Sequence, residues 1–229
     1  EGVFLDAACA LLHRRLSVID PSGGMQPMTI GGMTIVYNGE LYNTPELRNE
    51  LQSLGDSFDT TSDTEVLLRA YLRWGDACPQ KLNGIFAFAV YDPSRRRLFL
   101  ARDPMGVKPL FYARRGGSFF FASELKSLLC FPEIPPQVDA RGLYDLLFLG
   151  PGRTPGYGVF RGVYELEPGT CGYFDETGLH LSRYWKLHDR PCTDSFESAS
   201  EKTRWLLEDS IRRQLVSDVP IGSFLSGGL

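Results

Sequence analysis

The sequence lacks any long, uninterrupted apolar run. A membrane-spanning helix needs about 18 consecutive apolar residues, and the longest candidates in this 229-residue chain are broken by glycine or by charged side chains. Basic residues are not in excess either, because 24 lysines and arginines stand against 28 aspartates and glutamates, for a net charge of -4. Nucleic-acid binding requires a basic surface. These absences predict a soluble protein with neither a membrane nor a nucleic acid as partner.

Cysteine is scarce and widely spaced. The five cysteines form no C-x-x-C pair and have no neighbouring histidine: Cys9, Cys78, Cys130, Cys171 and Cys192. Metal sites built from cysteine and histidine need close spacing, so we expect no metal site. Free thiols are typical of a reducing compartment, which favours a cytoplasmic protein whose cysteines are unpaired.

Short apolar or alternating runs, separated by glycine, proline and aspartate, dominate the first two thirds of the chain. Such runs predict strands, which fall at residues 8–13, 34–37, 85–91, 97–101, 110–112, 119–122, 162–166, 170–174 and 179–185. Turn sequences at residues 92–94, 115–117 and 176–178 join neighbouring runs at hairpin distance. The sheets should therefore be largely antiparallel.

Helices are fewer, but their ends are marked. Pro45 and Gly55 bracket a predicted helix, and the segment from Ser62 to Glu65 has the sequence of a capping box. Apolar spacing places the helices at residues 46–54, 66–74, 124–130, 140–148 and 200–216. An apolar strand is expected at residues 219–225.

A polar segment divides the chain. Residues 186–198 contain little apolar material and read as a linker. We therefore expect a strand-rich domain at residues 1–185 and the first helix and strand of a second, α/β domain at residues 199–229.

Polar side chains in the strand-rich part could hold an amino acid by both ends. A carboxylate is best held by a guanidinium, which Arg15 supplies, and an ammonium by carboxylates, which Glu40 and Asp63 supply. Attack on a side-chain amide creates an oxyanion that needs a side-chain amide and a backbone N–H as donors. Asn38 and Gly39 form such a pair.

Each of these residues also has an ordinary structural explanation. An acid such as Asp63 in the first turn of a helix complements the helix dipole, and Asn38-Gly39 is a frequent turn dipeptide. Arg15 belongs to a short basic run, and Glu40 could be a surface charge. Their joint occurrence favours the amino-acid clamp.

The chain ends in an apolar run followed by Ser226-Gly227-Gly228. Serine and paired glycines after a strand leave backbone N–H groups free to surround an anion such as phosphate. Without support from elsewhere, a plain turn is the better interpretation.

Segments in one order over nearly the whole chain resemble the glutamine-hydrolysing asparagine synthetases. They are residues 13–20 (HRRLSVID), 37–43 (YNGELYN), 62–65 (SDTE), 102–110 (RDPMGVKPL) and 223–229 (SFLSGGL). The resemblance implies an α+β, N-terminal-nucleophile amidotransferase fold, which is a four-layer αββα sandwich. It further implies that the sandwich is followed by the first helix and strand of a Rossmann-like α/β synthetase domain.

The same resemblance implies roles for individual residues. Glutamine would be bound by Arg15, Leu16, Ser17, Val18, Ile19, Asn38, Gly39, Glu40 and Asp63, with Asn38 and Gly39 as the oxyanion hole. ATP would be bound by Leu225, Ser226, Gly227 and Gly228. The parent enzyme would be a ligase that forms carbon–nitrogen bonds, using glutamine as amide donor, aspartate, ATP and Mg²⁺, and the resemblance is compatible with a homodimer.

The family's nucleophile is a cysteine on a strand ahead of the Arg15 segment, and this chain has no cysteine in that place. Cys9 lies in the predicted strand at residues 8–13 without a free amine beside it, so we interpret it as a core thiol. We therefore expect a fragment, truncated at both ends, that is inactive and binds no cofactor by itself.

Two alternatives remain. One is an amidotransferase-like scaffold from a β-lactam-forming or peptide-cyclising relative, and the other is a non-catalytic glutamine-binding domain. Such relatives lose the nucleophile and degrade the clamp, whereas the clamp residues are all present here. Arg102 and Asp103 are expected to pair with each other and to support a loop.

Overall fold

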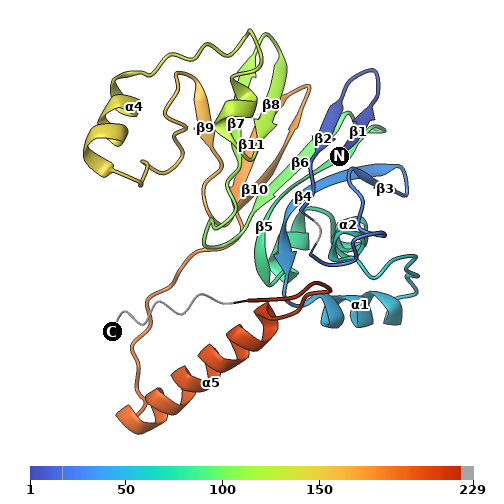
Figure 1. Cartoon of the computed structure of the whole chain (residues 1–229), viewed down its shortest axis with the longest axis vertical. Helices are drawn as coiled ribbons and strands as arrows, with labels where there is room; N and C mark the ends of the chain where they lie inside the picture. The colour runs from blue at the N-terminus through green and yellow to red at the C-terminus, as the bar shows by residue number, and fades with distance from the viewer. Residues whose placement is uncertain (17, 223–229) are drawn as a thin grey trace.

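A six-stranded antiparallel sheet forms the centre of the structure, a computed structural model that describes residues 1–16 and 18–222 (Figure 1). Its strand order is β11-β10-β6-β5-β4-β3. The strands are β3 (Met28–Ile30), β4 (Met33–Leu41), β5 (Gly84–Asp92), β6 (Arg97–Arg102), β10 (Thr170–Asp175) and β11 (Gly178–Arg183). The predicted turns join β5 to β6 and β10 to β11 as hairpins.

Strand alternation gives this sheet two apolar faces. Successive side chains of a strand point to opposite faces, and β5 therefore sends Phe86 and Phe88 to one core and Ala87 and Ala89 to another. The phenylalanine face is covered by helices α1 (Thr44–Ser53) and α2 (Asp63–Trp74), followed by a 3₁₀ turn η1 (Gly75–Lys81).

The alanine face packs against a second layer of strands. This layer contains a three-stranded sheet of order β8-β7-β9 and a separate hairpin, β1-β2. The strands are β1 (Gly2–Leu5), β2 (Ala10–His13), β7 (Phe111–Arg115), β8 (Ser118–Ala122) and β9 (Val163–Glu165). Leu11 from β2 and Leu110 and Leu166 beside the three-stranded sheet share one core with the central sheet.

Helical segments cover the outside of the second layer. α3 (Leu125–Leu128) contributes Leu128 to a third core with Phe111 and Val163. Farther along lie α4 (Ala140–Tyr144) and a π-type turn, η2 (Asp145–Leu149). The order helix, sheet, sheet, helix confirms the predicted four-layer αββα sandwich.

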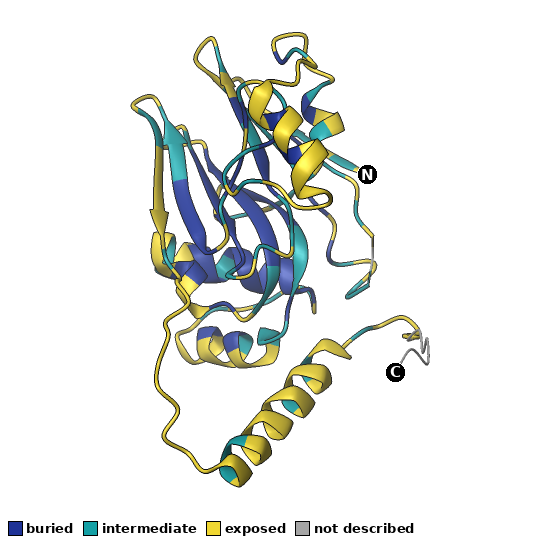
Figure 2. Ribbon diagram, turned by 90° about the vertical axis from the view of Figure 1, so that its left-hand side faces the viewer, coloured by how far each residue is buried: buried dark blue, intermediate teal, exposed yellow. Residues whose placement is uncertain are grey.

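Beyond the sandwich, α5 (Phe196–Gln214) stands apart and is exposed along its length (Figure 2). Ser195 caps it by accepting the N–H of Ser198 at 3.2 Å. The strand expected at residues 219–225 is not formed over residues 219–222, and the remaining positions lie outside the described residues. A strand needs a hydrogen-bonded neighbour, and no described segment pairs with this one.

Most predicted elements are confirmed, with corrections at their ends. β1 and β3 were not predicted, and Cys9 lies in the turn before β2 rather than in the strand. Ser62 caps α2 by accepting the Thr64 N–H at 3.2 Å, but Glu65 does not return to Ser62. Its carboxylate instead accepts the N–H of Thr60 at 2.7 Å, so the capping box is only half formed.

Within the described part of the chain, no helix has the length and apolar character needed to cross a membrane. Among the same residues, no group of histidine, cysteine, aspartate or glutamate is arranged to hold a metal ion.

Candidate functional site

The site begins where β4 loses one of its neighbours. β3 pairs with β4 only as far as Ile35, and beyond it every second residue of β4 turns its backbone groups away from β5. At Tyr37 these groups are held by side chains: its N–H donates to Gln26 Oε1 at 2.6 Å, and its carbonyl accepts from His13 Nε2 at 3.0 Å. Side chains therefore replace the missing strand.

Two residues farther along β4, the backbone N–H of Gly39 also points away from β5. Its N–H has no hydrogen-bond partner among the described residues, although Tyr37 on one side and Leu41 on the other are both satisfied. A β-carbon at Gly39 would come within 2.2 Å of the Ile85 carbonyl oxygen. Only glycine fits so close to β5, and it leaves an unpaired N–H donor at this edge.

A cavity of about 110 Å³ lies beside this edge. Its lining combines cationic, anionic and apolar side chains: His13, Arg15, Leu16, Val18, Ile19, Gln26, Tyr37, Gly39, Glu40, Asp63, Thr64 and Lys108.

Arg15 is held in place by the loop that follows it. Its Nη1 donates to the carbonyls of Asp20 at 2.9 Å and Pro21 at 3.4 Å, and its Nη2 donates to the carbonyl of Ile19. A guanidinium has five N–H donors, so two remain for a ligand. The loop thus orients the cation without exhausting it.

Asp20 keeps this loop folded back on itself. Its φ of 44° lies in the left-handed region, which favours glycine, asparagine and aspartate. Its carboxylate accepts from the N–H of Gly23 at 2.6 Å and from the N–H and hydroxyl of Thr61 at 2.9 and 3.0 Å. The bond from Gly23 is the main reason that the pKa of Asp20 is lowered.

Two carboxylates line the same cavity as Arg15. Asp63 begins α2 and is 4% exposed, and its Oδ2 accepts from the Tyr37 hydroxyl at 3.0 Å and the Leu41 N–H at 3.4 Å. Burial raises the pKa of Asp63 despite these bonds. Its Oδ1 and the whole carboxylate of Glu40 have no hydrogen-bond or ion-pair partner within residues 1–16 and 18–222.

The setting of His13 favours its neutral form. Burial lowers its pKa, and because Nε2 lies 3.0 Å from the Tyr37 carbonyl, Nε2 must carry the proton. Nδ1 is then an acceptor, and it is buried without a partner in the described structure.

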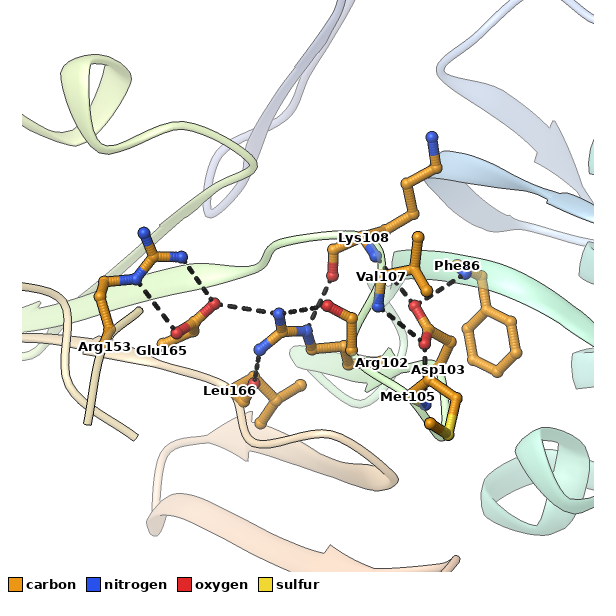
Figure 3. A network of polar contacts seen from close by, with 10 residues as sticks. Phe86, Arg102, Asp103, Met105, Val107, Lys108, Arg153, Glu165 and Leu166 are labelled. Atoms are coloured by element: carbon orange, nitrogen blue, oxygen red, sulfur yellow. Dashed lines mark hydrogen bonds and ion pairs between the residues drawn. The ribbon is translucent and has the colours of Figure 1, made fainter. Parts of the chain in front are cut away.

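Lys108 reaches the cavity from a loop that is anchored by Asp103 (Figure 3). The Asp103 carboxylate accepts backbone N–H groups of this loop, from Met105, Val107 and Lys108, each at 3.0 Å. It also accepts the N–H of Phe86 at 3.2 Å. The loop is therefore fixed to the central sheet.

The expected pairing of Arg102 with Asp103 is wrong. Arg102 instead forms a buried ion pair with Glu165 at 3.0 Å and donates to the carbonyls of Gly106 and Lys108, each at 2.8 Å (Figure 3). The side chains of neighbouring residues in an extended chain point in opposite directions. Arg102 and Asp103 therefore form hydrogen bonds with different parts of the loop.

The structure brings most of the predicted glutamine-binding residues to one cavity, but not all. Asn38 does not line it, and its Nδ2 donates to Ser123 Oγ at 3.3 Å. Five further predicted site residues lie outside the described residues: Ser17, Leu225, Ser226, Gly227 and Gly228.

Several lining residues had no predicted role: His13, Gln26, Tyr37, Thr64 and Lys108. His13, Tyr37, Thr64 and Lys108 belong to the sequence segments singled out above, so position within those segments was the available signal. A larger cavity of about 540 Å³, between the ends of the β7-β8 and β10-β11 hairpins, contains none of the predicted residues.

None of the five cysteines lines the charged cavity. Cys9 is half-buried in the β1-β2 turn, where burial and then the neighbouring Asp6 charge raise its pKa to about 11. A thiol with a raised pKa is a poor nucleophile at neutral pH, which agrees with its interpretation as a packing residue.

The αββα sandwich, with a pocket of mixed charge at the free edge of its central sheet, has the architecture of the N-terminal-nucleophile class of amidotransferase domains. Comparison with known families gives the same answer. The chain belongs to the glutamine amidotransferase domain family, whose model matches residues 1–185. A second family, asparagine synthase, matches residues 202–229.

Curated relatives include two proteins of Bacillus subtilis (strain 168). The glutamine-hydrolyzing asparagine synthetase 3 is 52% identical over an alignment 221 residues long, which covers 95% of this chain and 36% of that protein. Synthetase 1 is 36% identical over an alignment 232 residues long, which covers 100% of this chain and 36% of that protein. The chain thus spans about a third of the length of these relatives.

Among solved structures, the allosteric regulatory enzyme of purine biosynthesis superimposes with a TM-score of 0.52 and 23% identity. The match covers 76% of this chain and 35% of that enzyme. At this identity the likeness concerns the fold, and it agrees with the sandwich described above.

Proposed function

We propose that this chain is the glutamine-binding part of a glutamine-hydrolysing asparagine synthetase. The observation that carries the proposal is the joint presence of a guanidinium, two carboxylates without full partners and an unpaired backbone N–H on the wall of one cavity. Arg15 would take the α-carboxylate of glutamine through its two remaining donors. Asp63 Oδ1 and Glu40 would take the α-ammonium.

The side-chain amide of glutamine would lie against Gly39. Attack on that amide places negative charge on its oxygen, and a preorganised N–H stabilises this charge most in the transition state. Asn38 would be the second donor if its Nδ2 exchanged the 3.3 Å contact with Ser123 for the ligand. The part proposed for these residues is thus binding and charge stabilisation, and no cysteine among the described residues lines the cavity.

The proposal extends to the ammonia-using reaction. We infer a boundary that leaves residues 1–185 as the amidotransferase domain, 186–198 as a linker and 199–229 as the start of a domain that binds ATP, Mg²⁺ and aspartate. The names of the B. subtilis relatives and the asparagine synthase match at residues 202–229 support this inference. Assembly as a homodimer in the cytoplasm is part of the same proposal and rests on the resemblance alone.

Isothermal titration of the 229-residue chain tests the binding role. L-Glutamine should bind and D-glutamine should not, because inverting the α-carbon prevents the α-carboxylate and the α-ammonium from reaching Arg15 and the two carboxylates together. Arg15→Ala should lower the affinity for L-glutamine more than tenfold, since a charge-assisted, paired contact is lost. Equal heats for L- and D-glutamine, or an Arg15→Ala variant that binds like the wild type, would refute the proposal.

A further inference from the structure

The segment after α5 touches the loop that holds Arg15. Asp218 accepts the N–H of Asp20 through Oδ2 at 2.8 Å, and its own N–H donates to the Val18 carbonyl at 3.1 Å. These two bonds bracket Ile19. They join the part of the chain that matches asparagine synthase to the part that matches the amidotransferase domain.

The bonds from Asp218 act on the same backbone that orients Arg15. The carbonyls of Ile19 and Asp20 accept from the Arg15 guanidinium, and both belong to the segment that Asp218 clasps. The loop, with its left-handed residue at Asp20, is held in this conformation by two sets of contacts from outside it. Asp218 supplies one set, and Thr61 supplies the other through the Asp20 carboxylate.

The contact is polar and exposed, which makes it conditional. No residue of α5 is buried, and a further contact between the two regions is the ion pair between Arg213 and Glu46 of α1 at 2.7 Å. A junction held by a few hydrogen bonds and one surface ion pair can open without disturbing the apolar cores on either side.

We propose that Asp218 is a positioning residue that couples the glutamine pocket to the segment following α5. Through its hydrogen bonds to the backbone of Val18 and Asp20, Asp218 holds the Ile19 and Asp20 carbonyls next to the guanidinium of Arg15. The guanidinium therefore stays directed toward the cavity. When the segment moves away, the loop relaxes and glutamine binds more weakly. This inference rests on the proposed role of Arg15 in binding glutamine.

Coupling of this kind is reciprocal, because a contact that improves glutamine binding must itself be strengthened by glutamine. Glutamine should therefore slow hydrogen exchange at the backbone amides of residues 216–222 as well as in the loop around Asp20. A residue that merely stabilised the fold would not transmit this effect.

The test compares the wild-type chain with Asp218→Ala, Asp218→Asn and a matched control, Asp209→Asn. Asp209 lies in the same region and pairs with Arg213, but it does not touch the loop. We expect Asp218→Ala to weaken L-glutamine binding about tenfold with little change in melting temperature. Asp218→Asn keeps an acceptor for the Asp20 N–H and should restore most of the affinity, and Asp209→Asn should bind like the wild type.

Amide exchange without glutamine provides an independent measurement. The Asp20 amide should exchange faster in Asp218→Ala than in the wild type and in Asp209→Asn. Unchanged Asp20 exchange, or wild-type glutamine affinity in Asp218→Ala, overturns the coupling while leaving the pocket assignment intact. If Arg15→Ala binds glutamine normally, the pocket assignment itself fails and the coupling fails with it.

Discussion

The guanidinium of Arg15 lies over the backbone of Gly24: a β-carbon at Gly24 would come within 2.3 Å of Arg15 Nη2 and 2.7 Å of Ser62 Oγ. The residue that packs against the Arg15 guanidinium here, Gly24, thus has no side chain. Binding of glutamine should depend on a glycine that need not touch it.

Gly24→Ala should therefore impair glutamine binding. The added methyl group would collide with the end of the Arg15 side chain and with Ser62 Oγ, which caps α2. L-Glutamine affinity should therefore fall more than tenfold, and the melting temperature should fall as well because the cap is disturbed. Gly152→Ala is the matched control, because its β-carbon would meet only the Leu149 carbonyl oxygen at 3.4 Å. Calorimetry and thermal unfolding of both variants decide the matter, and normal binding by Gly24→Ala would show that Arg15 does not need its observed position.

Asp63→Asn should stabilise the protein and impair binding together. Burial raises the pKa of Asp63, so its ionisation costs folding free energy at neutral pH, and the variant avoids this cost. The difference should vanish as the pH falls below the ordinary value of 3.8 and should grow as the pH rises through the raised pKa. Urea unfolding at about pH 7 and about pH 4 measures it, and a wild type more stable than the variant at neutral pH would contradict the account.

Glu65, two residues along the same helix, should behave in the opposite way. Burial alone would raise its pKa, but bonds from Thr60, Asp59 and Arg69 outweigh burial and lower it. Its stabilising effect is therefore present above the ordinary value of 4.5 and is lost as the pH falls through the lowered pKa. Glu65→Gln should reduce the free energy of unfolding by about 2–4 kcal/mol at neutral pH, and the deficit should shrink in acid.

The buried pair of Arg102 and Glu165 should show strong coupling. Arg102→Met leaves the buried Glu165 carboxylate with only Arg153, at 3.3 Å, and removes the donor for several carbonyls. We expect a loss of about 3–5 kcal/mol in unfolding free energy. The double variant Arg102→Met/Glu165→Leu should be less destabilised than the sum of the single ones, and simple additivity in urea unfolding would count against the pair.

The exposed apolar side chains of α5 should promote association. Trp205, Leu206 and Leu207 are each about 60% exposed, and large exposed apolar patches favour self-association. Light scattering coupled to size exclusion should find oligomers for the wild-type chain and a shift toward monomer for Trp205→Glu/Leu206→Glu. A wild type that is monomeric at every concentration would contradict this expectation.

Local features of the fold could be predicted because their signals are local. A stretch of about ten residues is enough to recognise each of three features: the alternation of side-chain direction in β5, the turn at residues 92–94 and the start of α2 at Ser62. β1 and β3 are too short to show a period, and the half-formed capping box depends on Thr60, which competes for Glu65.

The charged residues of the site could be predicted from the sequence segments that contain them, but the residues that they contact could not. His13 bonds to Tyr37, Lys108 reaches the cavity from a distant loop, and Asp218 contacts Asp20 across 198 residues of sequence. Such contacts arise only when the chain has folded. For the same reason, the sequence could not show that Arg102 pairs with Glu165 and not with Asp103.

A crystal structure of the chain with L-glutamine tests the central claim most directly. We expect one glutamine in the cavity, with its α-carboxylate on the Arg15 guanidinium, its α-ammonium between Asp63 and Glu40, and its side-chain amide oxygen accepting from the Gly39 N–H. Glutamine bound in the reverse orientation, or bound elsewhere while Arg15 keeps only its loop carbonyls, would contradict it.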